Sequence, residues 1–237
     1  MMSALFYIAI TVLLVGVARK IHQYASTPAP LKIPTTPAPT TRAGVVWRMA
    51  REVVLFESLY KASKLTWIFG WLFHAGLLVV LLYHLQFFTE PVWNWVWWLL
   101  PLFPYASFAM LTGLGGLLAR RIFVDRVRVI SAPSDYLMLL LIMSIAATGL
   151  LMRYFWYPDI VALKQFATGL LSLKFVALPG GIVLLIHLLL VVALLIIFPF
   201  SKLLHAPGLF FSPSRYQVDN TRERRYTSVL SNHDKEA

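Results

Sequence analysis

Long apolar runs separated by short polar segments dominate the chain. Five of these runs reach about 18 residues or more, the length at which an α-helix crosses the hydrocarbon core of a bilayer. The pattern therefore predicts an all-α integral membrane protein with five transmembrane helices. We expect these helices at residues 1–18, 65–88, 99–119, 135–152 and 181–204.

Polar segments fill the intervals between the spans. Residues 65–204 form the predicted four-helix membrane core, residues 19–64 a first inner loop, and residues 205–237 a basic tail. Within the loop, the proline-rich stretch 27–41 predicts an extended spacer, and residues 45–64 have the pattern of an amphipathic helix. That helix has two interpretations: it lies on the membrane surface, or it docks a cytoplasmic partner.

Composition and charge support a membrane protein and fix its expected orientation. The chain has 237 residues, of which 59% are hydrophobic and 13% charged, whereas soluble domains have about 45–50% and about 25%. This excludes a soluble enzyme and a nucleic-acid-binding domain, despite a net charge of +11. Segments 19–64, 120–128 and 202–235 hold 18 of the 21 Lys and Arg residues. By the positive-inside rule, these segments face the cytoplasm, the N-terminus lies outside and the C-terminus inside.

The chain contains no cysteine. Disulfides, zinc–thiolate sites, cysteine-ligated iron–sulfur clusters and covalently attached c-type haem are thereby excluded from this chain.

Four histidines lie in or at the ends of two predicted spans: His74 and His84 in the second, His187 and His205 in the fifth. Ionisable residues inside a membrane are rare and usually functional, although an isolated histidine can simply be a helix contact. A proton relay would require acidic partners, and a zinc site would require the ligands to converge. Two bis-histidine b haems fit the pattern best. The opposite directions of the two spans pair His84 with His187 near the outer face and His74 with His205 near the inner face.

Other residues suit such cofactors without identifying them. Glycines in the spans, among them Gly76, Gly113 and Gly149, favour close approach of helices or of a macrocycle. Haem propionates are carboxylates, which arginine binds well, although the same arginines have an equally good interpretation as charges that set topology. The candidates for this role are Arg120, Arg121, Arg126 and Arg128.

Several segments resemble the γ-subunit family of respiratory nitrate reductase, a family of di-haem membrane cytochromes b. They are the spacings of the four histidines, "RRIFVDRVR" at 120–128, "FPFSKLLH" at 198–205 and "SRYQV" at 214–218. Residues 56–93 are most similar to the M subunit of the transmembrane complex associated with dissimilatory sulfite reductase. The resemblance implies two b haems, quinone exchange near the outer haem, and a cytoplasmic iron–sulfur partner like heterodisulfide reductase. The nitrate-reductase relatives have a lysine near their quinol site that this chain lacks, so Gly76, Tyr83 and Tyr105 are only general candidates there.

The resulting hypothesis is an electron-transfer subunit of an oxidoreductase complex in a prokaryotic inner membrane, with contacts to lipid and quinone and none to nucleic acid. It exchanges electrons between quinone and the partner, in either direction, in dissimilatory sulfur metabolism, and it does not itself act on the terminal substrate. A nitrate reductase γ subunit is the alternative within the family. A haem-free membrane anchor or transporter subunit is the alternative from another class.

Overall fold

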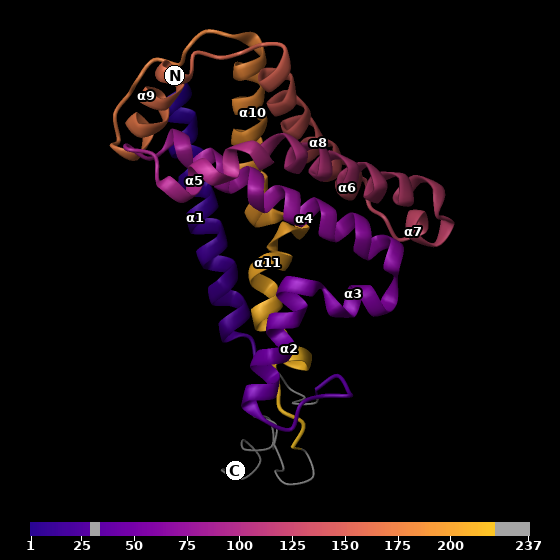
Figure 1. The fold of residues 1–237 in the computed structure, drawn as a ribbon. Helices are drawn as coiled ribbons and strands as arrows, with labels where there is room; N and C mark the ends of the chain where they lie inside the picture. The colour runs from indigo at the N-terminus through magenta and orange to yellow at the C-terminus, as the bar shows by residue number, and fades with distance from the viewer. Residues whose placement is uncertain (29–33, 221–237) are drawn as a thin grey trace. The chain divides into compact units, whose positions relative to one another are not determined.

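In a computed structural model of the chain, residues 1–28 and 34–220 are described, and every regular element in these ranges is a helix (Figure 1). Five helical segments are long and apolar enough to cross a membrane, which confirms the prediction of an all-helical chain with five candidate spans. They are Met2–Ser26, Lys64–Phe87, Asn94–Phe123, Pro133–Tyr154 and Ile182–Phe200. Their main helices are α1 (Met2–Ser26), α4 (Lys64–His84), α6 (Phe103–Phe123), α8 (Pro133–Tyr154) and α10 (Ile182–Ile197). The inside or outside position of the termini stays a prediction.

Shorter helices connect these five. The α-helical ones are α2 (Arg42–Leu55), α3 (Glu57–Ala62), α5 (Asn94–Leu99), α7 (Asp125–Val129), α9 (Ile160–Leu171), α11 (His205–Gly208) and α12 (Pro213–Tyr216). Turns of 3₁₀-helix are η1 (Leu85–Phe87), η2 (Leu100–Leu102), η3 (Phe198–Phe200), η4 (Lys202–Leu204) and η5 (Leu209–Phe211).

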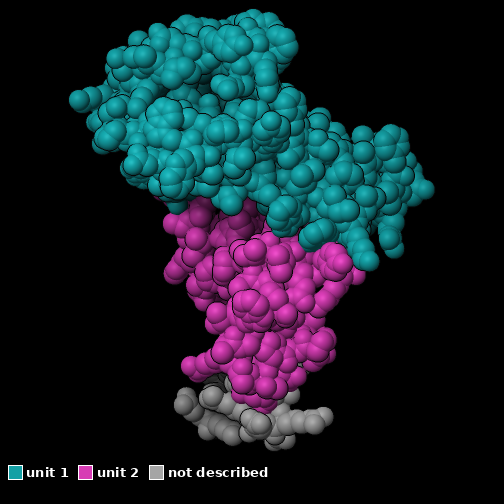
Figure 2. Space-filling view, viewed as in Figure 1, with its two compact units in different colours: residues 1–14, 63–198 teal, residues 15–62, 199–237 magenta. Residues whose placement is uncertain are grey.

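The chain divides into two compact units (Figure 2). Unit 1 comprises residues 1–14 and 63–198, and unit 2 comprises residues 15–62 and 199–237. In unit 1, α4 packs along α6, α6 packs on α8, and α8 packs on α10; the α4, α6 and α8 ribbons can be followed side by side in Figure 1.

Glycines bring α4 and α6 into backbone contact. A methyl group at Gly76 would lie 2.6 Å from the backbone oxygen of Ala106, and one at Gly113 would lie 2.6 Å from the backbone nitrogen of Phe73. Because neither backbone atom can move aside, only glycine allows this separation of the helices. Gly115, two residues further along α6, instead faces open space. The expected close approach is therefore found at Gly76 and Gly113.

The start of α1 packs into unit 1 beside α9 and α10. Phe6 and Ala9 form a buried cluster with Phe166 and Val192, and the rings of Phe6 and Phe166 meet edge to face with centroids 6.2 Å apart. The α9 helix is thus held by its apolar face within this unit.

Several helix ends differ from the sequence prediction. The first span was expected to end at residue 18, but α1 continues to Ser26. The amphipathic stretch 45–64 is divided into α2 and α3 at Phe56, which adopts a left-handed conformation with φ of 51°. The fifth span was expected to continue to Leu204, but α10 ends at Ile197 and the chain continues in 3₁₀ turns. Pro199 has no N–H to donate to the helix, and Ser201 is extended and caps the following turn by accepting from the Leu203 N–H at 3.2 Å.

In unit 2, the second half of α1 packs against the chain that follows Pro199. A methyl group at Gly16 would lie 2.6 Å from the ring of Pro199, and the rings of Tyr24 and Phe211 have centroids 6.1 Å apart. Residues 34–41 of the predicted extended spacer contain no helix, in agreement with the sequence, while residues 29–33 lie outside the described part of the chain.

Candidate functional site

The four histidines occupy three helices. His74 and His84 lie on α4, His187 lies on α10, and His205 is the first residue of α11. His187 is the most enclosed of them, with 8% of its surface exposed, and His74 and His84 are half-buried, whereas His205 is exposed. Because α10 ends before His205, the two histidines predicted to share one long helix are on separate elements.

Three of the imidazoles are oriented by the backbone of their own segment. Nδ1 of His74 lies 2.7 Å from the Gly70 carbonyl oxygen, Nδ1 of His84 lies 2.6 Å from that of Val80, and Nδ1 of His205 lies 2.9 Å from that of Lys202. A carbonyl oxygen can only accept a hydrogen bond, so Nδ1 carries the proton in each ring. The lone pair of the neutral imidazole is then on Nε2, the arrangement typical of a metal-ligating histidine.

His187 is oriented by a neighbouring helix instead. Its Nδ1 lies 2.9 Å from Oγ1 of Thr148 on α8, and the same hydroxyl lies 2.8 Å from the carbonyl oxygen of Ser144. The single hydroxyl proton is donated to that carbonyl, so Oγ1 accepts from Nδ1 and the lone pair of His187 is also on Nε2. A methyl group at Gly149 would lie 3.6 Å from Cε1 of His187. Thr148 and Gly149 of α8 therefore contact this imidazole and fix its orientation.

His84 on α4 and His187 on α10 both belong to unit 1. Their imidazoles interact electrostatically, and their pairing as ligands of one haem stays a prediction. His74 belongs to unit 1 and His205 to unit 2, so the pairing of these two stays a prediction.

Aromatic rings surround His84. The ring of Tyr83 stacks on Phe103 with centroids 3.8 Å apart, and the imidazole of His84 lies edge to face with Tyr83 and with Phe87, at 5.8 and 6.0 Å. Of the other sequence candidates for a quinone site, Tyr105 is 76% exposed, and Gly76 is at the contact of α4 with α6. Tyr83 is therefore the candidate that lies beside a candidate haem ligand.

Two of the four candidate propionate ligands have acidic partners among the described residues. Nη1 of Arg121 lies 3.5 Å from the carboxylate of the buried Asp135 and donates to the Ser131 hydroxyl at 2.8 Å. Nη2 of Arg128 lies 2.7 Å from the carboxylate of Asp125. These contacts give Arg121 and Arg128 a role in holding the connection between α6 and α8. Arg120 is at the end of α6 and Arg126 is exposed on α7; binding of propionates by any of the four stays a prediction.

The donor set fits a b-type haem. In the neutral form, each of the four imidazoles has its lone pair on Nε2. In the described part of the chain, no three or more His, Asp or Glu side chains gather as they would around a bare metal ion. A haem takes its equatorial ligands from the porphyrin and needs only axial ligands from the protein, a role that imidazole fills well.

Comparison with known proteins places the chain in a family. Residues 39–226 match the model of the nitrate reductase gamma subunit family. The chain belongs to this family. The resemblance inferred from the histidine spacings and from the segments at 120–128 and 198–205 is thus confirmed at the level of the family.

Named relatives of this gamma-subunit family member fall into two groups. The chain is 33% identical to the Hdr-like menaquinol oxidoreductase cytochrome b-like subunit of Archaeoglobus fulgidus, over 94% of this chain and 80% of the relative. The protein of the same name from Archaeoglobus profundus is 30% identical, over 95% and 81%. The respiratory nitrate reductase 2 gamma chain of Escherichia coli is 30% identical, over 64% of this chain and 76% of the relative.

Sequence reasoning did not find Thr148. The available signal was a polar residue in the middle of an otherwise apolar span. In many helices, however, the threonine hydroxyl simply donates a hydrogen bond to a backbone carbonyl of the preceding turn. Its second role, as the acceptor of the hydrogen bond from Nδ1 of His187, depends on which sides of α8 and α10 pack together. The sequence of this family member alone does not show this packing.

Proposed function

We propose that this family member is the cytochrome b subunit of a membrane-bound oxidoreductase complex. It transfers electrons between a quinone in the bilayer and a partner subunit. One observation carries the proposal: all four membrane histidines have Nδ1 bound to an oxygen acceptor, which leaves the lone pair on Nε2. Names of the relatives, a menaquinol oxidoreductase and a nitrate reductase, support the redox role and the quinone.

In this proposal, the chain binds two b haems. His84 and His187 hold the outer haem, and His74 and His205 hold the inner haem. A bound b haem supplies reversible one-electron chemistry. The residues of the chain orient the ligating nitrogens, exclude water with the apolar helices around His187, and place Tyr83 beside the outer site, where quinone would exchange.

The absence of cysteine supports placing iron–sulfur centres on another subunit. Iron–sulfur clusters need thiolate ligands, and this chain has none. Electrons therefore continue to clusters on a partner subunit, which we take to be an iron–sulfur protein like heterodisulfide reductase on the cytoplasmic side of the inner membrane. The similarity to the two Hdr-like subunits covers nearly the whole chain, which favours an Hdr-like complex over a nitrate reductase. The resemblance of residues 56–93 to the M subunit of the sulfite-reductase-associated complex extends the proposal to that complex and to sulfur metabolism.

Spectroscopy of the purified chain and of histidine variants tests the proposal. We expect a dithionite-reduced minus oxidised spectrum with a b-type α-band and two haems per chain. His84→Ala and His187→Ala should lose one and the same haem, and His74→Ala should lose the other. His22→Ala is the matched control, because His22 is exposed near the end of α1 and should retain both. Absence of a b-type α-band would refute haem binding and favour the haem-free anchor or transporter subunit. Loss of the same haem in the His74 and His187 variants would refute the proposed pairing of the ligands.

A further inference from the structure

Helix α2 in unit 2 exposes apolar residues along one side. Val46, Trp47 and Val53 are 69%, 64% and 41% exposed, and Ala50 is also exposed. On an α-helix these four residues cover an arc of about 120° that contains no polar residue. We call Val46, Trp47, Ala50 and Val53 the outer stripe of α2.

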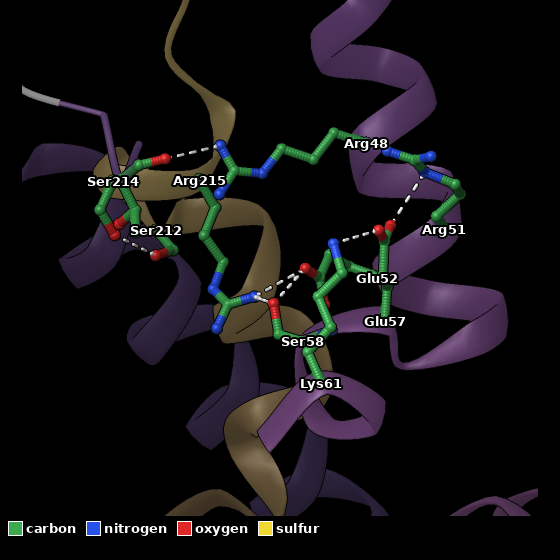
Figure 3. A network of polar contacts seen from close by, with 10 residues as sticks. Arg48, Arg51, Glu52, Glu57, Ser58, Lys61, Ser212, Ser214 and Arg215 are labelled. Atoms are coloured by element: carbon green, nitrogen blue, oxygen red, sulfur yellow. Dashed lines mark hydrogen bonds and ion pairs between the residues drawn. The ribbon is translucent and has the colours of Figure 1, made fainter. Parts of the chain in front are cut away.

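The opposite side of α2 carries buried charge. Glu52 is only 9% exposed, and its Oε1 lies 3.2 Å from Nη1 of Arg215 in α12. The same guanidinium donates to Oγ of Ser58 at 3.0 Å, and Ser58 donates a short hydrogen bond to Glu52. Figure 3 shows this group, with Arg215 reaching across from the C-terminal segment.

A second set of contacts fixes the same orientation. Nη1 of Arg48, one turn before Glu52, donates to the carbonyl oxygen of Thr35 at 3.1 Å, and the N–H of Thr35 donates to the carbonyl oxygen of Ser214 at 2.8 Å. Rotation of α2 to hide its outer stripe would break both sets of contacts. The polar side of the helix is therefore held inward, and the stripe is held outward.

This orientation is the reverse of that of a surface helix in water, which turns its apolar stripe toward the core. We propose that α2 lies in the plane of the membrane, with the outer stripe inserted into the boundary between headgroups and acyl chains. The proposal goes beyond the cytochrome function and does not depend on it. It resolves the two interpretations that the sequence left open for this helix.

Three features of the chain favour the bilayer as the surface that covers the outer stripe. Residue 64, where the membrane-spanning α4 begins, follows the end of α2 by nine residues, and nine residues reach at most about 30 Å, so α2 is tethered close to the membrane. Residues 42–64 also carry five basic side chains against two acidic ones, which complements anionic headgroups. Trp47 is of the residue type that is enriched at membrane interfaces.

Depth-dependent quenching of a fluorescent label tests the proposal. Because the chain has no native cysteine, single cysteines at Val46 or Val53 can each carry one bimane label without further changes. The full-length chain, alone and with its copurifying subunits, is reconstituted in vesicles of phosphatidylcholine and phosphatidylglycerol. Separate preparations carry a nitroxide on the headgroup, near the carbonyl end of the acyl chain, or near its methyl end. Ser26→Cys, at the exposed end of α1, is the water control, and Leu140→Cys, exposed within α8, is the deep-membrane control.

We expect the labels at Val46 and Val53 to be quenched most by the nitroxide near the carbonyl end, roughly twofold more than the label at Ser26. The label at Leu140 should respond most to the nitroxide near the methyl end. Quenching at both stripe positions no greater than at Ser26 overturns the proposal. In that case, blue-shifted emission means that a partner protein or a second copy covers the stripe, and water-like emission means that the stripe faces solvent.

Discussion

Replacing Thr148 by valine removes the acceptor of the His187 Nδ1–H bond while keeping the volume of the side chain. In the wild-type chain this bond is 2.9 Å long, and the hydroxyl is itself held by the Ser144 carbonyl. A hydrogen bond from Nδ1–H to an acceptor makes an axial imidazole more basic. The more basic ligand favours oxidised iron, so Thr148 lowers the reduction potential of the haem that His187 holds under the proposed function, and Thr148→Val should raise it.

The size of the shift follows from the energy of one hydrogen bond. A neutral hydrogen bond contributes about 1 kcal/mol net, and 1 kcal/mol corresponds to about 40 mV for a one-electron couple. Only the part of that energy that differs between the two iron oxidation states changes the potential. The carbonyl of Ile145 also interacts with this imidazole and retains part of the effect. We therefore expect a rise of about 10–40 mV.

Potentiometric titration of the b-type α-band measures the two haem potentials in one preparation. Thr148→Ser is the matched control, because it keeps the hydroxyl and should leave both potentials within a few millivolts of the wild type. The potential of the haem assigned to His74 should not change in either variant. A fall in the outer potential of Thr148→Val, or an equal shift in both variants, would refute the role of the hydroxyl.

Two further predictions concern stability. Gly113→Ala should destabilise the chain by about 1–3 kcal/mol, because its methyl group would lie 2.6 Å from the backbone nitrogen of Phe73; thermal unfolding in detergent should show a lower midpoint, whereas Gly115→Ala, which meets open space, should leave it unchanged. Glu57 accepts a hydrogen bond from the Lys61 ammonium at 2.6 Å, which holds the pKa of Glu57 below the ordinary value of 4.5. Because the pKa of Glu57 is lowered in the folded state, the stabilisation by this hydrogen bond is present above pH 4.5 and is lost as the pH falls through the lowered pKa. Limited proteolysis next to α3 should therefore accelerate with acidification in the wild type. The rate of proteolysis of Glu57→Gln should depend less on pH.

The number and approximate place of the spans could be predicted because the bilayer sets a minimum length of apolar sequence. Helix ends inside the polar segments could not be predicted in the same way. The division at Phe56 has no glycine or proline beside it, and the residues around it favour a continuous helix. Long-range contacts, such as that of Glu52 with Arg215, stabilise the break between α2 and α3. The pattern of apolar and polar residues along the chain does not predict such contacts.

The candidate site was predictable to the extent that it depends on local geometry. A histidine inside a helix always has the carbonyl of the preceding turn within reach, which accounts for the Nδ1 bonds of His74 and His84. His187 differs because its partner, Thr148, is on another helix, and that contact requires the relative rotation of α8 and α10. A proline in an apolar span, such as Pro199, predicts a distortion of the helix, but the extended Ser201 that follows it depends on the packing of this segment.

The buried acidic residues bear on the choice between electron transfer and ion or proton movement. Among the described residues, the buried carboxylates are those of Glu52 and Asp135. Each lies beside an arginine, Arg215 or Arg121, and each is outside the middle of a span. A proton pathway through a membrane uses acidic groups or histidines that exchange protons in series. The histidines have their Nδ1 protons bound to oxygen acceptors, so a relay would have to break these bonds at every transfer. Ligation through Nε2 leaves all of these bonds in place, and this favours electron transfer over a transporter as the function of the chain.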